Sequence, residues 1–193
     1  AAAADALGVP SHRAVARAAG EAAVTVLRLW PERRLPVPDG WSIHVTGWHD
    51  AGVKALPDTL EAAGRTVEVL WTGERPGARE IAKATKVQRK HDITVVVTAY
   101  LGAYPEQRQL VKELDRKGRT IIVSVRSPYD LAWFPAAPVL VATYGSTPVT
   151  MKALARILQG EIGASGTSPV RIPYPGRNQT LFPFGSGVTW TAP

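Results

Sequence analysis

The sequence predicts a three-layer α/β/α sandwich built on a doubly wound, mostly parallel sheet. Short β-branched runs alternate at least four times with amphipathic stretches of helical periodicity. The runs at 120–125 and 139–143 are apolar at successive positions, which is typical of strands buried on both faces. About a dozen residues separate these two runs, roughly the minimum for a crossover between parallel strands.

The elements can be assigned in order along the chain. Good helix formers at 12–23 predict a helix, and the alternating, β-branched segment at 24–30 predicts an extended strand. Prolines interrupt 31–40, which we interpret as a loop with a turn at Asp39-Gly40. The remaining patterns predict strands at 42–47, 66–72, 93–99, 120–125 and 139–143, and helices at 56–63, 78–90, 105–117 and 148–159.

Capping residues support several of these helices. Thr147 suits the N-cap of the last helix, with Pro148 in its first position, and Pro105 has the same place in an earlier helix. Gly64 and Gly160 suit helix C-termini, where the left-handed conformation favours glycine. The chain is therefore expected to switch regularly between helix and strand as far as residue 160.

The chain is expected to consist of two parts. Residues 1–40 hold the N-terminal helix, the extended segment and a linker loop, and residues 41–193 form the α/β sandwich domain. The tail from Gly163 is rich in Gly, Pro, Ser and Thr, and one short strand at 168–172 is expected there. The chain starts with an alanine-rich segment that lacks a signal-peptide pattern. We therefore expect the chain to be a piece of a longer protein.

Composition excludes several functional classes. At 193 residues the chain is shorter than the ~250 residues typical of a (β/α)8 barrel. It has no cysteine, and its histidines lack metal-ligand spacing, so no metal site is expected. No glycine-rich phosphate loop follows a strand, so no cofactor is expected. The net charge of +7 is mostly scattered, which argues against nucleic acid as a partner, and no apolar run is long enough for a membrane span.

Four ordered motifs resemble the C-terminal domain of glycoside hydrolase family 3, in its β-N-acetylhexosaminidase branch. They are AGEAAVTVLRLWPERRLPV near the start, VSVRSPYDLAWFPAAPVLVATYG in the middle, and MKALARILQGEIGASGTSPVRIP and LFPFGSGV near the end. Two departures concern local packing and subfamily. Ser168 replaces the usual apolar residue before Pro-Val, and His49-Asp50 replaces a common Gly-Pro turn.

The resemblance implies a retaining glycoside hydrolase whose aspartate nucleophile lies on a preceding (β/α)8 barrel of the same polypeptide. In the hexosaminidase branch the barrel also supplies the acid/base, a histidine on a mobile loop. In the β-glucosidase branch this domain instead supplies a glutamate. The expected partners are therefore the barrel and the carbohydrate substrate, a terminal β-N-acetylglucosaminide, and the expected location is secreted or in the cell envelope.

Three glutamates near loops are the acid/base candidates of this sequence. Retaining hydrolysis needs two carboxyl groups about 5 to 5.5 Å apart across the sugar. Glu106 is predicted in the first turn of a helix, where the helix dipole lowers the pKa and disfavours a general acid. Glu80 is predicted on a helix surface. Glu74, in a loop after a strand, remains a weak candidate, and no catalytic residue is assigned to this chain.

The turn after the 120–125 strand holds the more specific residues. We expect Arg126, Tyr129, Asp130 and Tyr144 to lie at the substrate cleft or the barrel interface. We favour a structural role over this functional one. In the structural role, Asp130 caps a short helix and Tyr129 packs its ring. His49 and Asp50 resemble an acid/base dyad, but adjacent residues in an extended loop rarely point at each other.

Three interpretations remain open from the sequence. The first is a structural domain that covers the barrel and is inactive alone. The second is a standalone carbohydrate-binding module. The third is a β-glucosidase-type domain that contributes a glutamate acid/base.

Overall fold

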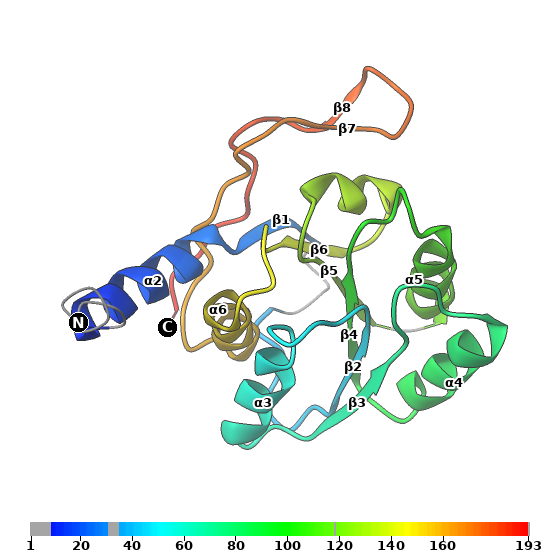
Figure 1. Ribbon diagram of the computed structural model, residues 1–193, viewed down its shortest axis with the longest axis horizontal. Helices are drawn as coiled ribbons and strands as arrows, with labels where there is room; N and C mark the ends of the chain where they lie inside the picture. Colours follow the sequence, from blue (N-terminus) through cyan, green and yellow to red (C-terminus); the bar gives the residue numbers. More distant parts are fainter. Residues whose placement is uncertain (1–8, 31–34, 118, 193) are drawn as a thin grey trace, which may run out of the picture.

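The computed structural model describes residues 9–30, 35–117 and 119–192 (Figure 1). Up to residue 160 its elements begin and end within one or two residues of the predicted bounds. The strands are β1 (Thr25–Leu29), β2 (Ile43–Gly47), β3 (Val67–Trp71), β4 (Ile93–Thr98), β5 (Thr120–Ser124), β6 (Val139–Ala142), β7 (Ile172–Pro173) and β8 (Thr180–Phe182). The helices are α2 (Pro10–Ala23), α3 (Ala55–Ala62), α4 (Ala78–Gln88), α5 (Pro105–Lys117), α6 (Pro148–Gln159) and the 3-10 helix η1 (Pro128–Trp133).

Six strands form the central sheet in the order β1-β6-β5-β4-β2-β3. All neighbouring pairs are parallel except β1 with β6, so the predicted mostly parallel sheet is confirmed. The crossover between β5 and β6 is parallel, as its length predicts, and η1 lies within it. β1 belongs to this sheet because Thr25, Val26 and Leu27 are buried in it. The division of the chain at residue 40 stays a prediction.

Helices cover both faces of the sheet, which gives the three predicted layers (Figure 1). On one face, α3 and α6 pack over a core that contains Val95, Val97 and Ile121. On the other, α4, α5 and η1 cover Val96 and Ile122. All residues of β4 are buried, with Val95 and Val97 in one core and Val96 in the other, so both faces of the strand are covered.

Helix α6 has the capping expected from its sequence. The Thr147 hydroxyl oxygen accepts a hydrogen bond from the backbone N–H of Thr150 at 3.3 Å, and Pro148 opens the helix. Gly160 ends it in the left-handed conformation, with a φ of +78°. The cap fixes the position where the chain leaves the β6 loop, beside the site described below.

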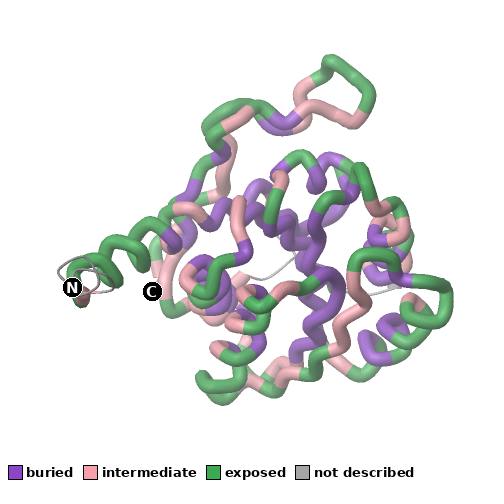
Figure 2. The backbone as a smooth tube through the Cα atoms, viewed as in Figure 1, coloured by how far each residue is buried: buried purple, intermediate pink, exposed green. Residues whose placement is uncertain are grey.

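Helix α2 lies outside the layers. Figure 2 shows it exposed along most of its length, beside a sheet that is buried. Gly20 is the buried residue of this helix and approaches Val149 of α6, whereas Val15 is 70% exposed. None of the helices in the described ranges is long and apolar enough to cross a membrane.

The tail differs from its prediction. The strand expected at 168–172 is wrong except at Ile172, because the Ser168 hydroxyl donates a hydrogen bond to the Val170 carbonyl at 2.8 Å and bends the chain. Instead β7 and β8 form an antiparallel hairpin that reaches out from the sandwich (Figure 1). Strand β7 of this hairpin contacts η1 of the sandwich.

The two edges of the sheet differ in how they are covered. The backbone N–H of Val188, in the tail, donates a hydrogen bond to the Val26 carbonyl at 2.7 Å and so covers part of the outer side of β1. At the opposite edge, β3 is hydrogen-bonded to β2 on one side, and within the described residues no strand lies on its other side.

Candidate functional site

Loops from four parallel strands meet at the carboxyl edge of the sheet. The register aligns the ends of these strands, because Gly47 pairs with Val97, and Thr98 with Ser124. The loops that follow carry most of the polar and aromatic groups of this edge. We define the carboxyl-edge cluster as Trp48 and Asp50 after β2, Tyr100 after β4, Arg126 after β5, and Tyr144 and Ser146 after β6.

Asp50 is the centre of the carboxyl-edge cluster. Its Oδ1 accepts hydrogen bonds from the backbone N–H groups of Gly52 at 2.9 Å and Val53 at 3.0 Å. Its Oδ2 accepts from the Ser146 hydroxyl at 2.5 Å and from Arg126 Nη2 at 3.2 Å. One carboxylate therefore joins the loops that follow β2, β5 and β6.

The surroundings of Asp50 keep it ionised. Partial burial would by itself raise its pKa, but hydrogen bonds from Ser146, Val53 and Gly52 and the charge of Arg126 outweigh that effect. The pKa of Asp50 therefore lies below its ordinary value. A low pKa and saturated oxygens suit a structural anion, because a general acid must hold a proton near neutral pH.

Gly52 allows this arrangement to close. A Cβ at this position would lie 1.9 Å from the Ser146 carbonyl oxygen, so the β2 and β6 loops meet backbone to backbone. Any side chain would push the loops apart and would separate Asp50 from Ser146.

Arg126 is held in place at the surface of the edge. Its guanidinium lies 5.5 Å from the centroid of the Trp48 ring and 5.9 Å from that of Tyr100, in addition to its ion pair with Asp50. Such contacts favour a fixed orientation for a cation. The Arg126 side chain remains 40% exposed, so it can reach a neighbouring group.

Two tyrosines of the cluster have an uncommon backbone conformation. Tyr100 and Tyr144 have φ angles of +59° and +56°, in the left-handed region that large residues rarely adopt. Tyr100 is 45% exposed, whereas Tyr144 is half-buried and its hydroxyl has no hydrogen-bond partner within the described residues. Strained positions of this kind gather at functional sites. The sequence prediction missed Tyr100, although an aromatic residue directly after a buried strand was the available signal.

The expected cap at Asp130 is wrong. Asp130 lies inside η1 and is buried, and its Oδ1 accepts a hydrogen bond from the backbone N–H of Leu101 at 3.1 Å. It therefore ties η1 to the β4 loop. Burial raises its pKa to about 6, against the lowering effect of the backbone N–H groups of Leu101 and Tyr100.

The structure separates the four residues expected at the cleft or interface. Arg126 and Tyr129 are exposed, Tyr144 is half-buried and Asp130 is buried. The expectation that the Tyr129 ring packs away is wrong, because the side chain is 48% exposed. The role of these residues at an interface stays a prediction.

The glutamate candidates do not converge. Glu74 is exposed in the loop after β3, where its backbone carbonyl accepts a hydrogen bond from Gln107 Nε2 at 3.2 Å. Glu106 lies in the first turn of α5, and Glu80 is exposed on α4, both as predicted.

His49 and Asp50 do not form a dyad. Asp50 makes the contacts described above, and the His49 ring stacks on Trp71 with their centroids 5.0 Å apart. Within the described ranges, no group of three or more His, Asp and Glu side chains is arranged to hold a metal ion.

Fold and site together define an α/β domain with a structured, aromatic carboxyl edge, similar to a domain of known glycoside hydrolases. No family model matches the chain. A curated β-N-acetylglucosaminidase/β-glucosidase from Cellulomonas fimi is 29% identical over 87% of this chain, which corresponds to 34% of that protein. The chain thus spans about a third of the length of the relative it matches.

Solved structures agree on the fold. A glycoside hydrolase family 3 β-N-acetylglucosaminidase from Paenibacillus sp. str. FPU-7 aligns over 83% of the chain and 32% of its own, with a TM-score of 0.75 and 24% identity. A β-glucosidase from Listeria innocua aligns over 95% of the chain and 34% of its own, with a TM-score of 0.76 and 18% identity. The resemblance to the C-terminal domain of glycoside hydrolase family 3 is confirmed, and the similar proteins are named as β-N-acetylglucosaminidases and as β-glucosidases.

Proposed function

We propose that this chain is the C-terminal α/β domain of a family 3 glycoside hydrolase that acts on terminal β-N-acetylglucosaminides. The domain supports a catalytic (β/α)8 barrel of the same polypeptide, and its carboxyl edge shapes the barrel's substrate cleft. The similarity to a β-N-acetylglucosaminidase/β-glucosidase, of which the chain spans 34%, supports the proposal. The parent enzyme is secreted or lies in the cell envelope.

The carboxylates at the carboxyl edge carry the proposal. Retaining hydrolysis needs one ionised carboxylate and one proton donor on opposite sides of the sugar. Asp50 is committed to Ser146 and Arg126, and Asp130 is buried under the β4 loop. Neither group is free to attack or protonate a substrate, so the chain alone is catalytically silent.

Exposed rings and a fixed cation make this edge suitable for contact with another domain. Tyr100 is 45% exposed, and Arg126 lies beside it in a constrained orientation. Exposed aromatic groups mark interaction surfaces, and tyrosine and arginine are enriched among the residues that dominate binding energy there. The carboxyl-edge cluster therefore faces the barrel.

Hydrolysis assays test the proposed silence. The purified chain is expected to release no chromophore from a nitrophenyl β-N-acetylglucosaminide or β-glucoside above a buffer blank. With the barrel supplied in trans, Glu74→Ala and the control Glu80→Ala are both expected to leave the rate unchanged. Hydrolysis by the chain alone, or a rate lost specifically with Glu74→Ala, would overturn the assignment.

Association with the barrel tests the proposed interface. Arg126→Glu reverses the fixed charge of the carboxyl-edge cluster and is expected to weaken binding to the isolated barrel by about tenfold or more. Arg89→Glu, at the exposed C-cap of α4, is the matched control and should bind as the wild type does. Equal affinities for both variants would place the interface elsewhere.

A further inference from the structure

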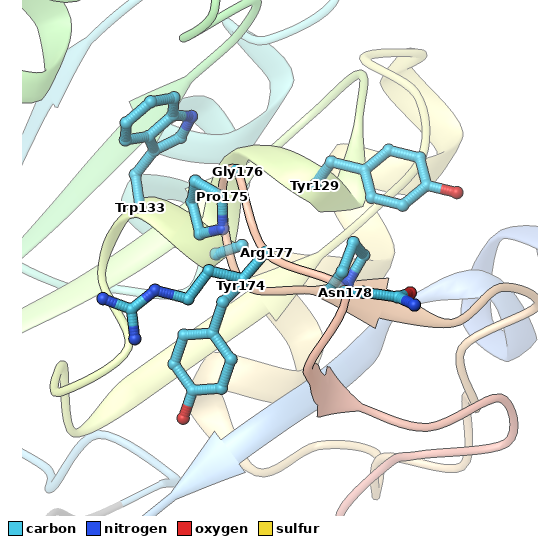
Figure 3. A pocket seen from close by; sticks show the side chains of 9 residues that line it. Tyr129, Trp133, Tyr174, Pro175, Gly176, Arg177 and Asn178 are labelled. Carbon is cyan, nitrogen blue, oxygen red and sulfur yellow. The ribbon is translucent and has the colours of Figure 1, made fainter.

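A cleft separate from the carboxyl-edge cluster lies between η1 and the β7–β8 hairpin (Figure 3). Its volume is about 760 Å³, within the range of small-molecule sites. One wall comes from η1 and the other from the hairpin, so two segments about 40 residues apart in sequence build it. Apart from the interface role expected for Tyr129, none of the roles discussed above uses this cleft.

Two large rings of η1 reach the cleft while remaining open to solvent. Tyr129 is 48% exposed and Trp133 39% exposed, although aromatic side chains gain most from burial. Figure 3 shows the rings on opposite sides of Pro175 and Gly176. A ligand that contacts both rings must therefore be extended. The Arg108 guanidinium lies 4.1 Å from the centroid of the Trp133 ring and helps to fix that ring.

The hairpin presents its side chains from a tight turn. The backbone N–H of Arg177 donates a hydrogen bond to the Tyr174 carbonyl at 3.1 Å, and Gly176 has a φ of +68°. Proline followed by a glycine with positive φ is the signature of a type II turn. Tyr174 and Arg177 are thus the first and fourth residues of the turn, next to the cleft.

The polar groups of the cleft are available to a ligand. Arg177 and Asn178 are exposed, and within the described residues neither side chain has a hydrogen-bond partner. The hairpin is held instead by backbone groups, such as the Asn178 carbonyl, which accepts a hydrogen bond from Arg171 Nη1 at 3.2 Å. A guanidinium supplies donors, and an amide supplies both donors and an acceptor.

Aromatic faces beside neutral and cationic hydrogen-bonding groups suit a β-linked sugar chain of gluco configuration. Its ring substituents are equatorial, so each sugar offers apolar C–H faces to aromatic rings and hydroxyls around its edge. The described residues that line the cleft include no carboxylate, so none of them requires a cationic ligand. An apolar peptide would leave the Arg177 and Asn178 side chains without partners.

We propose that the cleft between η1 and the β7–β8 hairpin is a non-catalytic subsite that binds β-linked gluco-configured oligosaccharides. Tyr129 and Trp133 support successive sugar rings, and Arg177 and Asn178 hydrogen-bond to their hydroxyls. The choice of sugar rests on the proposed function, since the similar enzymes are named for β-N-acetylglucosaminides and β-glucosides. The subsite would hold units of a long substrate away from the bond that is cleaved.

Calorimetric and NMR titrations of the 193-residue chain test the subsite. Chitotetraose and cellotetraose are the β-linked probes, and maltotetraose, which is α-linked, is the comparison. Saturable binding is expected for at least one β-linked probe, with binding of maltotetraose at least about tenfold weaker. The stronger of the two β-linked probes shows whether an acetamido group contributes.

Variants then locate the binding. Trp133→Ala and Tyr129→Ala are each expected to weaken the affinity by about tenfold or more. Trp30→Ala is the matched control, because Trp30 is 43% exposed and does not line the cleft. Trp133→Phe, which keeps an aromatic face, should retain most of the affinity. Circular dichroism checks that each variant is folded.

Defined outcomes would overturn the proposal. No saturable binding of either β-linked probe, equal binding of maltotetraose, or unchanged affinity in Trp133→Ala and Tyr129→Ala would each exclude the subsite. Such a failure leaves the proposed support of the barrel intact, since that is measured by barrel association. Hydrolysis of a probe by the chain would instead contradict the proposed function.

Discussion

At the scale of single residues, one carboxylate organises the carboxyl edge. Asp50 accepts hydrogen bonds from Ser146, from Arg126 and from two backbone N–H groups, so it fixes three loops at once. Its pKa is held below the ordinary value mainly because these hydrogen bonds outweigh its partial burial. An aspartate that is ionised and saturated with donors makes this edge rigid.

Replacing Asp50 should therefore cost stability in a pH-dependent way. Asp50→Ala is expected to lower the free energy of unfolding by about 1–3 kcal/mol at pH 7, because hydrogen bonds to a charged group are lost. A depressed folded-state pKa contributes stability above the unfolded pKa of about 4, and that stability is lost as the pH falls through the folded pKa. The deficit should therefore shrink below pH 4, as measured by urea unfolding.

Asp58→Ala, at an exposed position of α3, is the control and should unfold near the wild-type midpoint. An Asp50→Ala variant as stable as the wild type at pH 7 would show that the loops are held by other contacts.

The same residues show what could be predicted from the sequence. The motif at 126–130 identified a segment at the carboxyl edge, because strand ends follow from hydrophobic patterns. The hydrophobic pattern did not predict the direction in which each side chain of this segment points. Asp130 was expected to cap η1 but bonds to Leu101, a residue 29 positions away, and no local pattern contains that contact. Partners of this kind depend on tertiary packing.

At the scale of elements, α2 and the β7–β8 hairpin stand apart from the sandwich. Helix α2 touches α6 near Gly20, with an ion pair between Glu21 and Arg156, and otherwise faces solvent. A 14-residue helix is only marginally stable without packing. The free energy that holds most of α2 in shape is therefore small compared with that of the central strands.

Hydrogen exchange should reveal this difference. Backbone amides of residues 14–19 in α2 are expected to exchange at least about a hundredfold faster than those of β4 and β5, whose residues are buried. Exchange measured by mass spectrometry on the intact chain compares the segments directly, with α6 as a packed helix of similar length. Equal protection in α2 and α6 would indicate that another surface covers α2.

Sequence patterns located nearly all elements of the sandwich but missed the hairpin. Long periodic segments such as 148–159 carry their own signal, because a helix buries one face. The hairpin strands are two and three residues long, too short for periodicity. The Pro175-Gly176 dipeptide was the available signal, since it predicts a type II turn between two short extended runs.

At the scale of the whole molecule, two buried groups respond to pH in opposite directions. Burial and the nearby His91 lower the pKa of His44 to about 4, and its ring nitrogens have no partner within the described residues. The folded state therefore resists protonating His44, so stability falls as the pH drops below 6.5. Burial raises the pKa of Asp130 to about 6, so stability falls as the pH rises from 4 to 6.

The two effects should largely cancel between pH 4.5 and 6. Each corresponds to about 3 kcal/mol at most, from roughly two pKa units at 1.36 kcal/mol per unit. The wild-type chain is expected to show a shallow dependence of urea midpoint on pH in this window. His44→Leu should become less stable as the pH rises, and Asp130→Asn more stable. Parallel slopes in all three proteins would contradict the balance.

The free edge of β3 bears on how the molecule behaves at high concentration. An unpaired strand edge is a template for a second chain, and Val69 on this strand is 36% exposed. Glu68 places a charge between the apolar residues of this edge, and its Oε2 lies 3.5 Å from Nε2 of His91. A charge on an edge strand discourages pairing of one sheet with another, so we expect Glu68 to oppose aggregation.

Glu68→Val should therefore increase self-association, with little effect on the fold. Light scattering at rising protein concentration is expected to show larger particles for Glu68→Val than for Glu61→Val, which adds the same side chain on the exposed surface of α3. If both variants behave alike, general hydrophobicity and not the open edge governs solubility. The sheet that carries the carboxyl-edge cluster thus also has an open edge, and we expect the charge of Glu68 to limit its assembly with copies of itself.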